Sequence, residues 1–266
     1  LPLPPLPEPR SAFDGYRIVR ELHGSSRSHI YLATDMESGD SVVIKIPSID
    51  ARGDPDYLRR FLMEEWVARR ITSPHVLKPE ALTRSRNFLY VVTEFIEGQT
   101  LTQWMIDNPR PDLETVRRIV EQIAEGLTAF HRREMLHQDL RPENIMIDAT
   151  GTAKIIDFGS VRVTGVAETM PETDVEILGT VQYTAPEYFL GSVGNDQSDL
   201  YSLGVIAYQM LTGHLPYGAA AARAHTASSQ RRLKYRPAMD EQRNIPIWVD
   251  GALRRAVHPD PARRYD

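Results

Sequence analysis

Two acids and an amide in the second half of the sequence are spaced so that they could bind a metal and handle a proton. Asp139 and Asn144 lie in LHQDLRPENIMID, between two apolar runs, and Asp157 ends the apolar run KIID thirteen residues after Asn144. Carboxylate and amide oxygens suit Mg²⁺, which is usually completed by water and substrate phosphates. Asn144 and Asp157 could therefore bind magnesium, and Asp139 could accept or orient the proton of an attacking hydroxyl. Any one of them alone could instead be a loop residue that caps a turn.

A lysine and a glutamate in the first half are predicted to pair. Lys45 lies in SVVIKIP among apolar neighbours, where an ammonium group is costly to bury without an anion. Glu64 follows nineteen residues later on a segment with helical spacing and supplies a counter-charge, whereas the adjacent Glu65 faces elsewhere on that helix. The alternative is that these are two unrelated surface charges.

The elements that must position these residues change in character near residue 97. Before it, the short β-branched or alternating runs 16–22, 30–34 and 42–46 predict an antiparallel sheet, which continues in FLYVVTEFI. One helix is predicted over 57–71, with Pro55 near its start.

After residue 97 the sequence pattern is mainly helical. An apolar stripe over 116–130 predicts an amphipathic helix, and the run 199–211 predicts a more buried one that ends at Gly213. The motif around Asp139 therefore follows a long helix in the mainly helical half.

Composition limits the possible functions. The 266 residues are 41% hydrophobic, which is enough for one large domain or two lobes that share a cleft. Lys and Arg number 31 against 36 Asp and Glu, so the net charge of -5 argues against nucleic acid as the main partner. The absence of cysteine excludes disulfides and thiolate metal sites and suits a cytoplasmic location. No apolar run approaches ~18 residues, so membrane contact is not indicated.

The two ends suggest a piece of a longer protein. LPLPPLPEPR has five prolines in ten residues, which favours extended polyproline II, so residues 1–12 are expected to be a linker that buries no core. At the other end, PDPARRYD predicts a last helix that is truncated.

Taken together, these motifs resemble the eukaryotic-type protein kinase family, of the serine/threonine branch. VVIK is similar to the family's VAIK strand, HQDLRPEN to its HRDLKPEN catalytic loop and GTVQYTAPE to its GTxxYxAPE segment, and DFG is intact. The resemblance covers roughly residues 16–266. It implies an α+β, two-lobed fold, with a small antiparallel sheet and one helix over 13–97, a large mainly helical lobe over 98–266, and ATP between the lobes.

The resemblance also implies roles for the residues of the phosphate chemistry. It makes the protein an ATP-dependent enzyme in which Lys45 holds the α- and β-phosphates and is positioned by Glu64. Asn144 and Asp157 would carry Mg²⁺, and Asp139 would serve the hydroxyl of a protein substrate. Arg141 replaces the usual lysine and still presents positive charge to the γ-phosphate, although its planar fork differs from an ammonium group.

The nucleotide site and its covering loop contain the largest departure from the family. The resemblance implies that backbone groups around Glu94 and Ile96 bind adenine, beside a gatekeeper at Thr93 and near Ile30. His23, Ser25 and Ser28 stand where the three loop glycines belong. Without glycine the backbone loses easy access to positive φ, and this favours as an alternative function a pseudokinase scaffold that binds nucleotide weakly.

The remaining family positions have structural or regulatory roles. Gln138 replaces the arginine before the catalytic aspartate, so activity is not expected to require phosphorylation of the activation segment, although Thr169 and Thr173 are possible autophosphorylation sites.

Three further residues match family positions that stabilise the fold or determine which hydroxyl is phosphorylated. Glu187 is expected to pair with Arg264, and Asp199 to bind the backbone of the catalytic loop. Thr180 matches the threonine typical of serine/threonine kinases, and its GTxxYxAPE context disfavours a small-molecule phosphotransferase.

A narrower resemblance is to bacterial kinases fused to an upstream PP2C-type phosphatase. The stretches RFLMEEWVARRITSPHVLKP and EMLHQDLRPENIMID are typical of that group. It implies a phosphatase domain before residue 1 and leaves room for a membrane anchor after Asp266.

Overall fold

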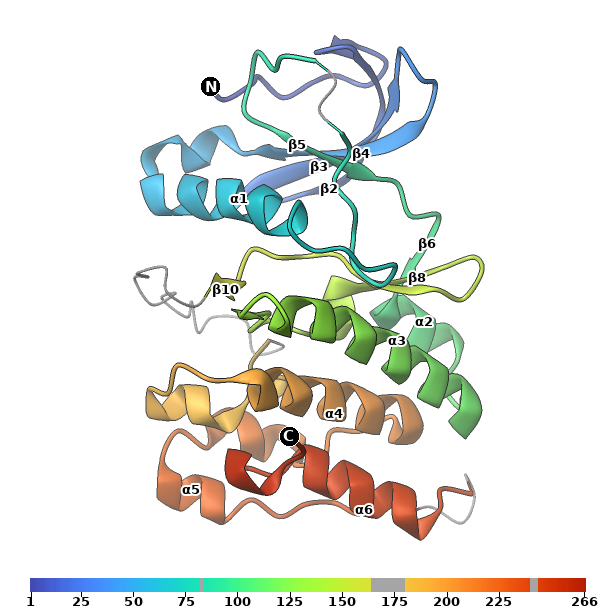
Figure 1. The fold of residues 1–266 in the computed structure, drawn as a ribbon, viewed down its shortest axis with the longest axis vertical. Coiled ribbons are helices and arrows are strands. Elements are labelled where there is room, and N and C mark those ends of the chain that lie inside the picture. The colour runs from blue at the N-terminus through green and yellow to red at the C-terminus, as the bar shows by residue number, and fades with distance from the viewer. Residues whose placement is uncertain (82–83, 164–179, 240–243) are drawn as a thin grey trace. The chain divides into compact units, whose positions relative to one another are not determined.

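The computed structural model describes residues 1–81, 84–163, 180–239 and 244–266, which form two compact units (Figure 1). The N-terminal unit comprises Leu1–Thr72 and Val76–Glu97, and the C-terminal unit comprises Ser73–His75 and Gly98–Asp266. The boundary after Glu97 lies where the sequence pattern changes from sheet to helix.

The N-terminal unit is built on a five-stranded antiparallel sheet in the order β1-β2-β3-β4-β5. The strands are β1 Ala12–Phe13, β2 Tyr16–Gly24, β3 Ser28–Asp35, β4 Ser41–Pro47 and β5 Val91–Glu94. Alternation decides which side chains are buried: Val42, Ile44 and Ile46 of β4 enter an apolar core, while Lys45 points to the opposite face.

One helix packs with this sheet. Helix α1, Pro55–Ala68, follows the short 3₁₀ helix η1, Ile49–Gly53. It begins at Pro55 because the Asp54 side chain accepts a hydrogen bond from the Tyr57 amide at 2.9 Å. It ends three residues before the predicted Ile71, and the chain then passes through His75, whose carbonyl accepts from the Ile155 amide of the C-terminal unit.

The proline-rich start differs from the expected linker. Residues 1–11 form no helix or strand, as their prolines predict, but Pro4 is buried and Leu3 packs in an apolar cluster of the N-terminal unit. The Leu89 amide donates to the Pro2 carbonyl at 2.9 Å. The segment is therefore packed on the unit, because its leucine meets an apolar surface that the sequence pattern alone does not reveal.

The C-terminal unit is mainly helical, with α3 and α4 side by side (Figure 1). Its α-helices are α2 Leu101–Asp107, α3 Leu113–His131, α4 Asp196–Thr212, α5 Ala227–Arg231 and α6 Ile247–Ala256. Helix α4 is buried over most of its length; it starts with a capping box between Asn195 and Ser198 and stops at Gly213, which has a φ of 72°.

Short strands and 3₁₀ turns carry the loops of this unit. The sheet β6-β8-β9 consists of Gly98–Thr100, Ile145–Asp148 and Ala153–Ile155, and a second pair joins β7 Met135–Leu136 to β10 Arg162–Val163. The 3₁₀ helices are η2 Pro142–Asn144, η3 Thr180–Gln182, η4 Pro186–Leu190, η5 Gly218–Arg223 and η6 Pro261–Arg263. The helix predicted to begin near the end of the sequence is the short η6.

Two of the three tryptophans are exposed. Trp66 is 37% exposed and Trp248 is 70% exposed. The Arg70 guanidinium lies 3.6 Å from the centre of the Trp66 ring, so a charged side chain covers that indole instead of the core. Among the helices of the described residues, none is long and apolar enough to cross a membrane.

Candidate active site

Lys45 and Glu64 form the predicted ion pair within the N-terminal unit. The Lys45 ammonium donates to both carboxylate oxygens of Glu64, at 2.9 and 2.7 Å. The side chains are 23% and 12% exposed, and the ammonium lies 5.9 Å from the ring centre of Phe61, one turn earlier on α1. Lys45 lies on strand β4 and Glu64 lies on α1. The ion pair therefore forms only when the helix is correctly placed against the sheet.

Glu65, the neighbouring acid, has a different role. It accepts hydrogen bonds from Arg69 of the same helix and from Arg86, whose guanidinium also donates to the Tyr90 carbonyl at 2.6 Å. Burial opposes ionisation, but the two arginines outweigh it and lower the pKa of Glu65. The two adjacent glutamates thus face different partners, as the helical spacing predicts.

The loop that replaces the glycine-rich loop is closed by a serine. The Ser25 hydroxyl accepts from the Arg27 and Ser28 amides at 3.2 and 3.1 Å, and the Ser25 amide donates to the Ser28 carbonyl at 2.9 Å. Among the described residues, all those from His23 to Ser28 have φ outside the left-handed region. The loop therefore makes its turn without the conformation that glycine would be needed for.

The residues expected around adenine lie on β3 and at the end of β5. Ile30 stands opposite Lys45 in the β3–β4 register, and Thr93 stands opposite Val43 in the next pair. The Glu94 amide donates to the Lys78 carbonyl at 3.0 Å, so this amide is already used within the unit. Ile96 is 7% exposed.

In the C-terminal unit, a buried aspartate holds the turn before Asp139. The Asp199 carboxylate is 1% exposed and accepts from the His137 and Gln138 amides, both at 2.9 Å, as the sequence predicts. Gln138 has a φ of 66°, which is strained for a side chain of this kind, and the two hydrogen bonds offset that strain. His131 Nε2 lies 2.8 Å from the same carboxylate.

Asp139 and Asn144 are fixed against each other by this loop. The Asn144 side-chain amide donates to the Asp139 carbonyl at 2.8 Å and to its carboxylate at 3.1 Å, while Arg141 Nε lies 3.7 Å from the same carboxylate. Burial raises the pKa of Asp139 above its ordinary 3.8, and nearby Asp157 adds to this, although Arg141 and His137 oppose it.

Asp157 is tied to the same region through the backbone. The Ile156 amide donates to the Asn144 carbonyl at 2.9 Å, and Asp157 Oδ1 accepts from the Gly159 amide at 2.9 Å. Phe158 is buried against Phe130 of α3, with ring centres 5.6 Å apart. The polar side chains of this region, Asn144 and Asp157, can offer oxygen atoms as metal ligands. The side-chain nitrogen of Asn144 faces the Asp139 carboxylate, so the side-chain oxygen of Asn144 points away from that carboxylate. This donor set fits a hard divalent cation such as Mg²⁺.

Glu187 and Arg264 make the predicted structural pair. The guanidinium donates to both carboxylate oxygens at 2.8 and 2.7 Å and also to the carbonyls of Gln197, His258 and Pro259. The exposed fractions are 8% for the Glu187 side chain and 0% for that of Arg264.

His131 was missed as a member of the site by sequence reasoning. Its bond to Asp199 depends on α3 and α4 meeting, and the available signal was a histidine in the last turn of a helix, where a positive charge is favoured. Thr169 and Thr173 lie outside the described residues, and Thr180 starts η3.

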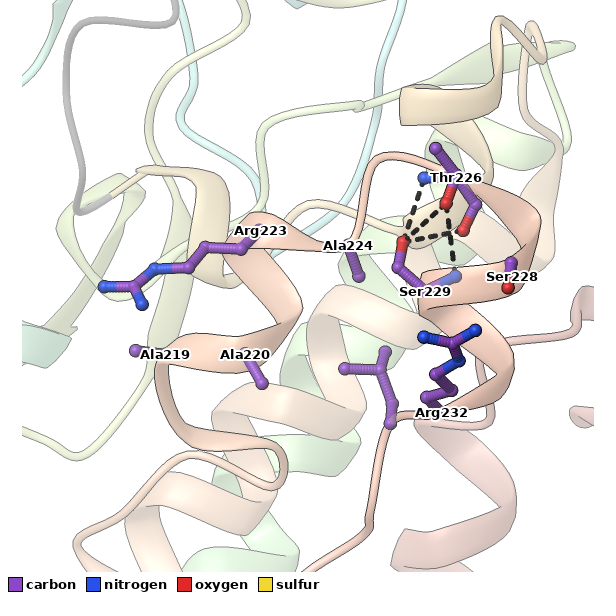
Figure 2. A pocket seen from close by; sticks show the side chains of 9 residues that line it. Ala219, Ala220, Arg223, Ala224, Thr226, Ser228, Ser229 and Arg232 are labelled. Carbon is purple, nitrogen blue, oxygen red and sulfur yellow. Dashed lines mark hydrogen bonds between the residues drawn. The ribbon is translucent and has the colours of Figure 1, made fainter.

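A separate pocket of about 470 Å³ lies over η5 and α5, between Ala219 and Leu233 (Figure 2). In Figure 2, the Thr226 and Ser229 side chains hydrogen-bond to each other, and the Arg223 side chain points away from them. Its lining contains none of the residues predicted for the site. The basic run 231–236 beside it has its arginines and lysine exposed.

Comparison with known proteins identifies the family. Residues 16–266 match the family model of the protein kinase domain. The serine/threonine-protein kinase PrkC of Bacillus subtilis is 30% identical over 94% of this chain and 38% of its own length. PknL of Mycobacterium tuberculosis is 31% identical over 94% of this chain and 62% of its own length.

The solved structures include a similar kinase domain. That of Mycobacterium tuberculosis PknI, in a double-mutant form, is 26% identical with a TM-score of 0.68, covering 98% of this chain and 94% of the other. This chain spans less than two thirds of the full length of PrkC and of PknL. Its α+β architecture is that of the protein kinase fold, and the chain belongs to the protein kinase domain family.

Proposed function

We propose that this chain is a protein serine/threonine kinase that transfers the γ-phosphate of ATP to protein hydroxyls, including its own. The observation that carries the proposal is the arrangement of Asp139 against Asn144, with Asp157 joined to Asn144 through the Ile156 amide. The preference for serine and threonine rests on the names of PrkC and PknL and on the match at Thr180.

The proposal assigns the phosphates to Lys45 and the metal to Asn144 and Asp157. ATP supplies the phosphoryl group and Mg²⁺ neutralises phosphate charge when bound. Lys45, held by Glu64, presents an ammonium to the α- and β-phosphates. Asn144 and Asp157 would hold the metal.

The remaining nucleotide contacts come from the N-terminal unit. The backbone of Glu94 and Ile96 would contact adenine, and the Glu94 amide, which donates to the Lys78 carbonyl, is not assigned to this contact. Ser25, Ser28 and Ile30 cover the phosphates and sugar, and the Ser25 turn gives this loop a defined shape without glycine. This turn is the reason that we favour an active kinase over a pseudokinase scaffold.

Asp139 orients the substrate hydroxyl and takes its proton as the phosphate is transferred. A partly buried carboxylate with a raised pKa is a better proton acceptor than a fully exposed one when it is ionised at neutral pH. Asn144 fixes its rotamer, and Arg141 lies close enough to share its charge with the γ-phosphate.

The test is incubation with labelled ATP, Mg²⁺ and a generic basic protein, comparing wild type with Asp139→Asn. We expect transfer by wild type and a loss of roughly 10²–10⁴-fold in the variant, since this is the usual contribution of a positioned proton acceptor. The exposed Asp40→Asn variant is the matched control and keeps wild-type activity. Intact folding of wild type without transfer in this assay would contradict the proposal and support a scaffold.

Activity is proposed not to depend on prior phosphorylation of the activation segment. Gln138 carries no charge that a phosphate would need to neutralise, and its amide is already held by Asp199. The double variant Thr169→Ala, Thr173→Ala is therefore expected to retain activity within about threefold of wild type, a change of less than ~1 kcal/mol in barrier. Loss of activity in this variant would show that the segment does need phosphate.

We propose that the kinase domain works in the cytoplasm and that a PP2C-type phosphatase domain precedes it in the same polypeptide. The support is the resemblance of the segments around α1 and the catalytic loop to kinases of that arrangement. Reading the coding sequence upstream of Leu1, and beyond Asp266 for a membrane anchor, tests both statements.

A further inference from the structure

The segment before β1 meets the part of the N-terminal unit that positions Lys45. Its Leu3 packs against a cluster of Phe61, Leu89 and Val91, which are 3%, 7% and 5% exposed. The Leu89 amide donates to the Pro2 carbonyl at 2.9 Å, and Pro4 is buried. One backbone hydrogen bond and one apolar side chain thus fix residues 2–4 in place.

This contact is selective within a repetitive sequence. LPLPPLP offers three leucines, but Leu1 is 72% exposed and Leu6 is 43% exposed, whereas Leu3 joins the cluster. A segment that bound only by non-specific hydrophobic contact would not pack one of these leucines into the cluster and leave the other two exposed. Proline limits the backbone freedom lost on docking, so a short stretch of this composition can be ordered by few contacts.

The cluster touches the Lys45–Glu64 pair from two sides. Phe61 lies on α1 one turn before Glu64, with its ring centre 5.9 Å from the Lys45 ammonium. Val91 stands opposite Lys45 in the β4–β5 register. Leu3 therefore packs against a cluster whose members come from the helix that carries the glutamate and from the strand beside the lysine.

Helix α1 contributes three side chains to this contact: Phe61 belongs to the cluster, and Tyr57 and Leu58 pack against it, as Leu3 does. Glu65, which is also buried on α1, is held by arginines and not by apolar packing. Because Leu3 comes from outside the helix, its removal takes away apolar contact that α1 cannot supply itself, and we expect this loss to loosen the helix.

We propose that residues 2–4 act as a strap in which Leu3 is a positioning residue, holding Phe61 and α1 so that Glu64 stays bound to Lys45. The inference deepens the proposed function, since it assigns part of the kinase's competence to a segment that precedes the sheet. Leu3 acts through Phe61 and makes no contact with substrate in this scheme.

The first test compares Leu3→Asp with the matched control Leu6→Asp, which introduces the same charge three residues away at an exposed position. Hydrogen exchange is followed without nucleotide, so the result does not depend on catalysis. We expect faster exchange over 57–68 in Leu3→Asp alone, with α3 amides 113–131 unchanged. No change over 57–68, or an equal rise in both helices, would overturn the strap.

The second test measures the steady-state kinetics of phosphate transfer. Leu3→Asp is expected to lower kcat/KM for ATP about tenfold, within the roughly 10²-fold that a misplaced group can cost, while Leu6→Asp stays within twofold. The conservative Leu3→Met restores the wild-type value. If wild type shows no transfer, the proposed function fails while hydrogen exchange still decides the strap.

A third test deletes the segment and then adds it back as a free peptide. Deletion of residues 1–6 is expected to reproduce the Leu3→Asp pattern, and adding the free peptide LPLPPLPEPR should restore protection over 57–68, whereas the peptide with aspartate in place of its second leucine should not. This arm also decides the matter if Leu3→Asp fails to fold. Equal effects of the two peptides would contradict the proposal.

Discussion

Two carboxylate–cation pairs, one in each unit, are built for different purposes. Arg264 is 0% exposed and donates to both oxygens of Glu187 and to three backbone carbonyls, so its guanidinium is surrounded by fixed acceptors. Lys45 is 23% exposed and is held by Glu64 of α1. The first pair is closed and the second is partly open.

The difference shows how the same chemistry serves stability or function. A guanidinium with planar, bidentate geometry satisfies a buried carboxylate and leaves little for a ligand. An ammonium at a partly exposed site keeps a charge that incoming phosphates can share. The open pair must be kept in place by its surroundings, and these are Phe61, Val91 and the segment that covers them.

Substitution of Lys45 should give the largest of the expected effects, and this effect should be a loss of activity. In Lys45→Met, kcat/KM is expected to fall by at least ~10²-fold, because loss of preorganised charge at a transferring phosphate costs several kcal/mol. The melting temperature should fall less than in a variant of the fully buried Arg264, because the Lys45 side chain is 23% exposed and water can reach this pair. The exposed Lys234→Met is the control. If Lys45→Met transferred phosphate as fast as wild type, the Lys45–Glu64 pair would have no role in catalysis, and this prediction would be wrong.

Breaking the closed pair should act on stability instead. Arg264→Leu leaves the Glu187 carboxylate buried without its partner, which is expected to lower the free energy of unfolding by roughly 3–5 kcal/mol. Urea denaturation followed by circular dichroism measures it. Arg263→Leu, at an exposed neighbouring position, should lie within ~0.5 kcal/mol of wild type. Equal stabilities of the two variants would mean that the closed pair contributes no more than a surface charge.

A smaller effect is expected from pH at His131, which links α3 to the catalytic loop through Asp199. Burial lowers the pKa of His131, but the hydrogen bond to Asp199 and the charges of Asp199 and Asp196 outweigh it, so the pKa lies above 6.5. The protonated histidine thus adds stability that is complete below pH 6.5 and is lost as pH rises through the folded-state pKa.

The corresponding variant is His131→Gln, which can donate to Asp199 but does not titrate. The stability difference between wild type and this variant should shrink as pH rises above 6.5, by an amount smaller than either effect above. Denaturation at several pH values between 5 and 9 measures it. A difference that stays constant with pH would show that His131 carries the same charge throughout this range.

Sequence reasoning predicted several contacts of the candidate site. The pairing of Lys45 with Glu64, the separate orientation of Glu65 and the support of the catalytic loop by Asp199 follow from helix and strand periodicity together with the ordered kinase motifs. The limits of β4, α3 and α4 agree with the patterns within a few residues, since capping residues and glycine mark the ends.

The amino-acid sequence was therefore sufficient to predict the order of the elements, the polar residues of the candidate site and, through the kinase resemblance, the chemistry proposed for them. The packing of Leu3 against the cluster that contains Phe61, the contact of His131 with Asp199 and the exposure of Trp66 and Trp248 became known only from the three-dimensional structure. These outcomes depend on contacts between segments distant in the chain, and neither periodicity nor composition records which apolar surface a given side chain will meet.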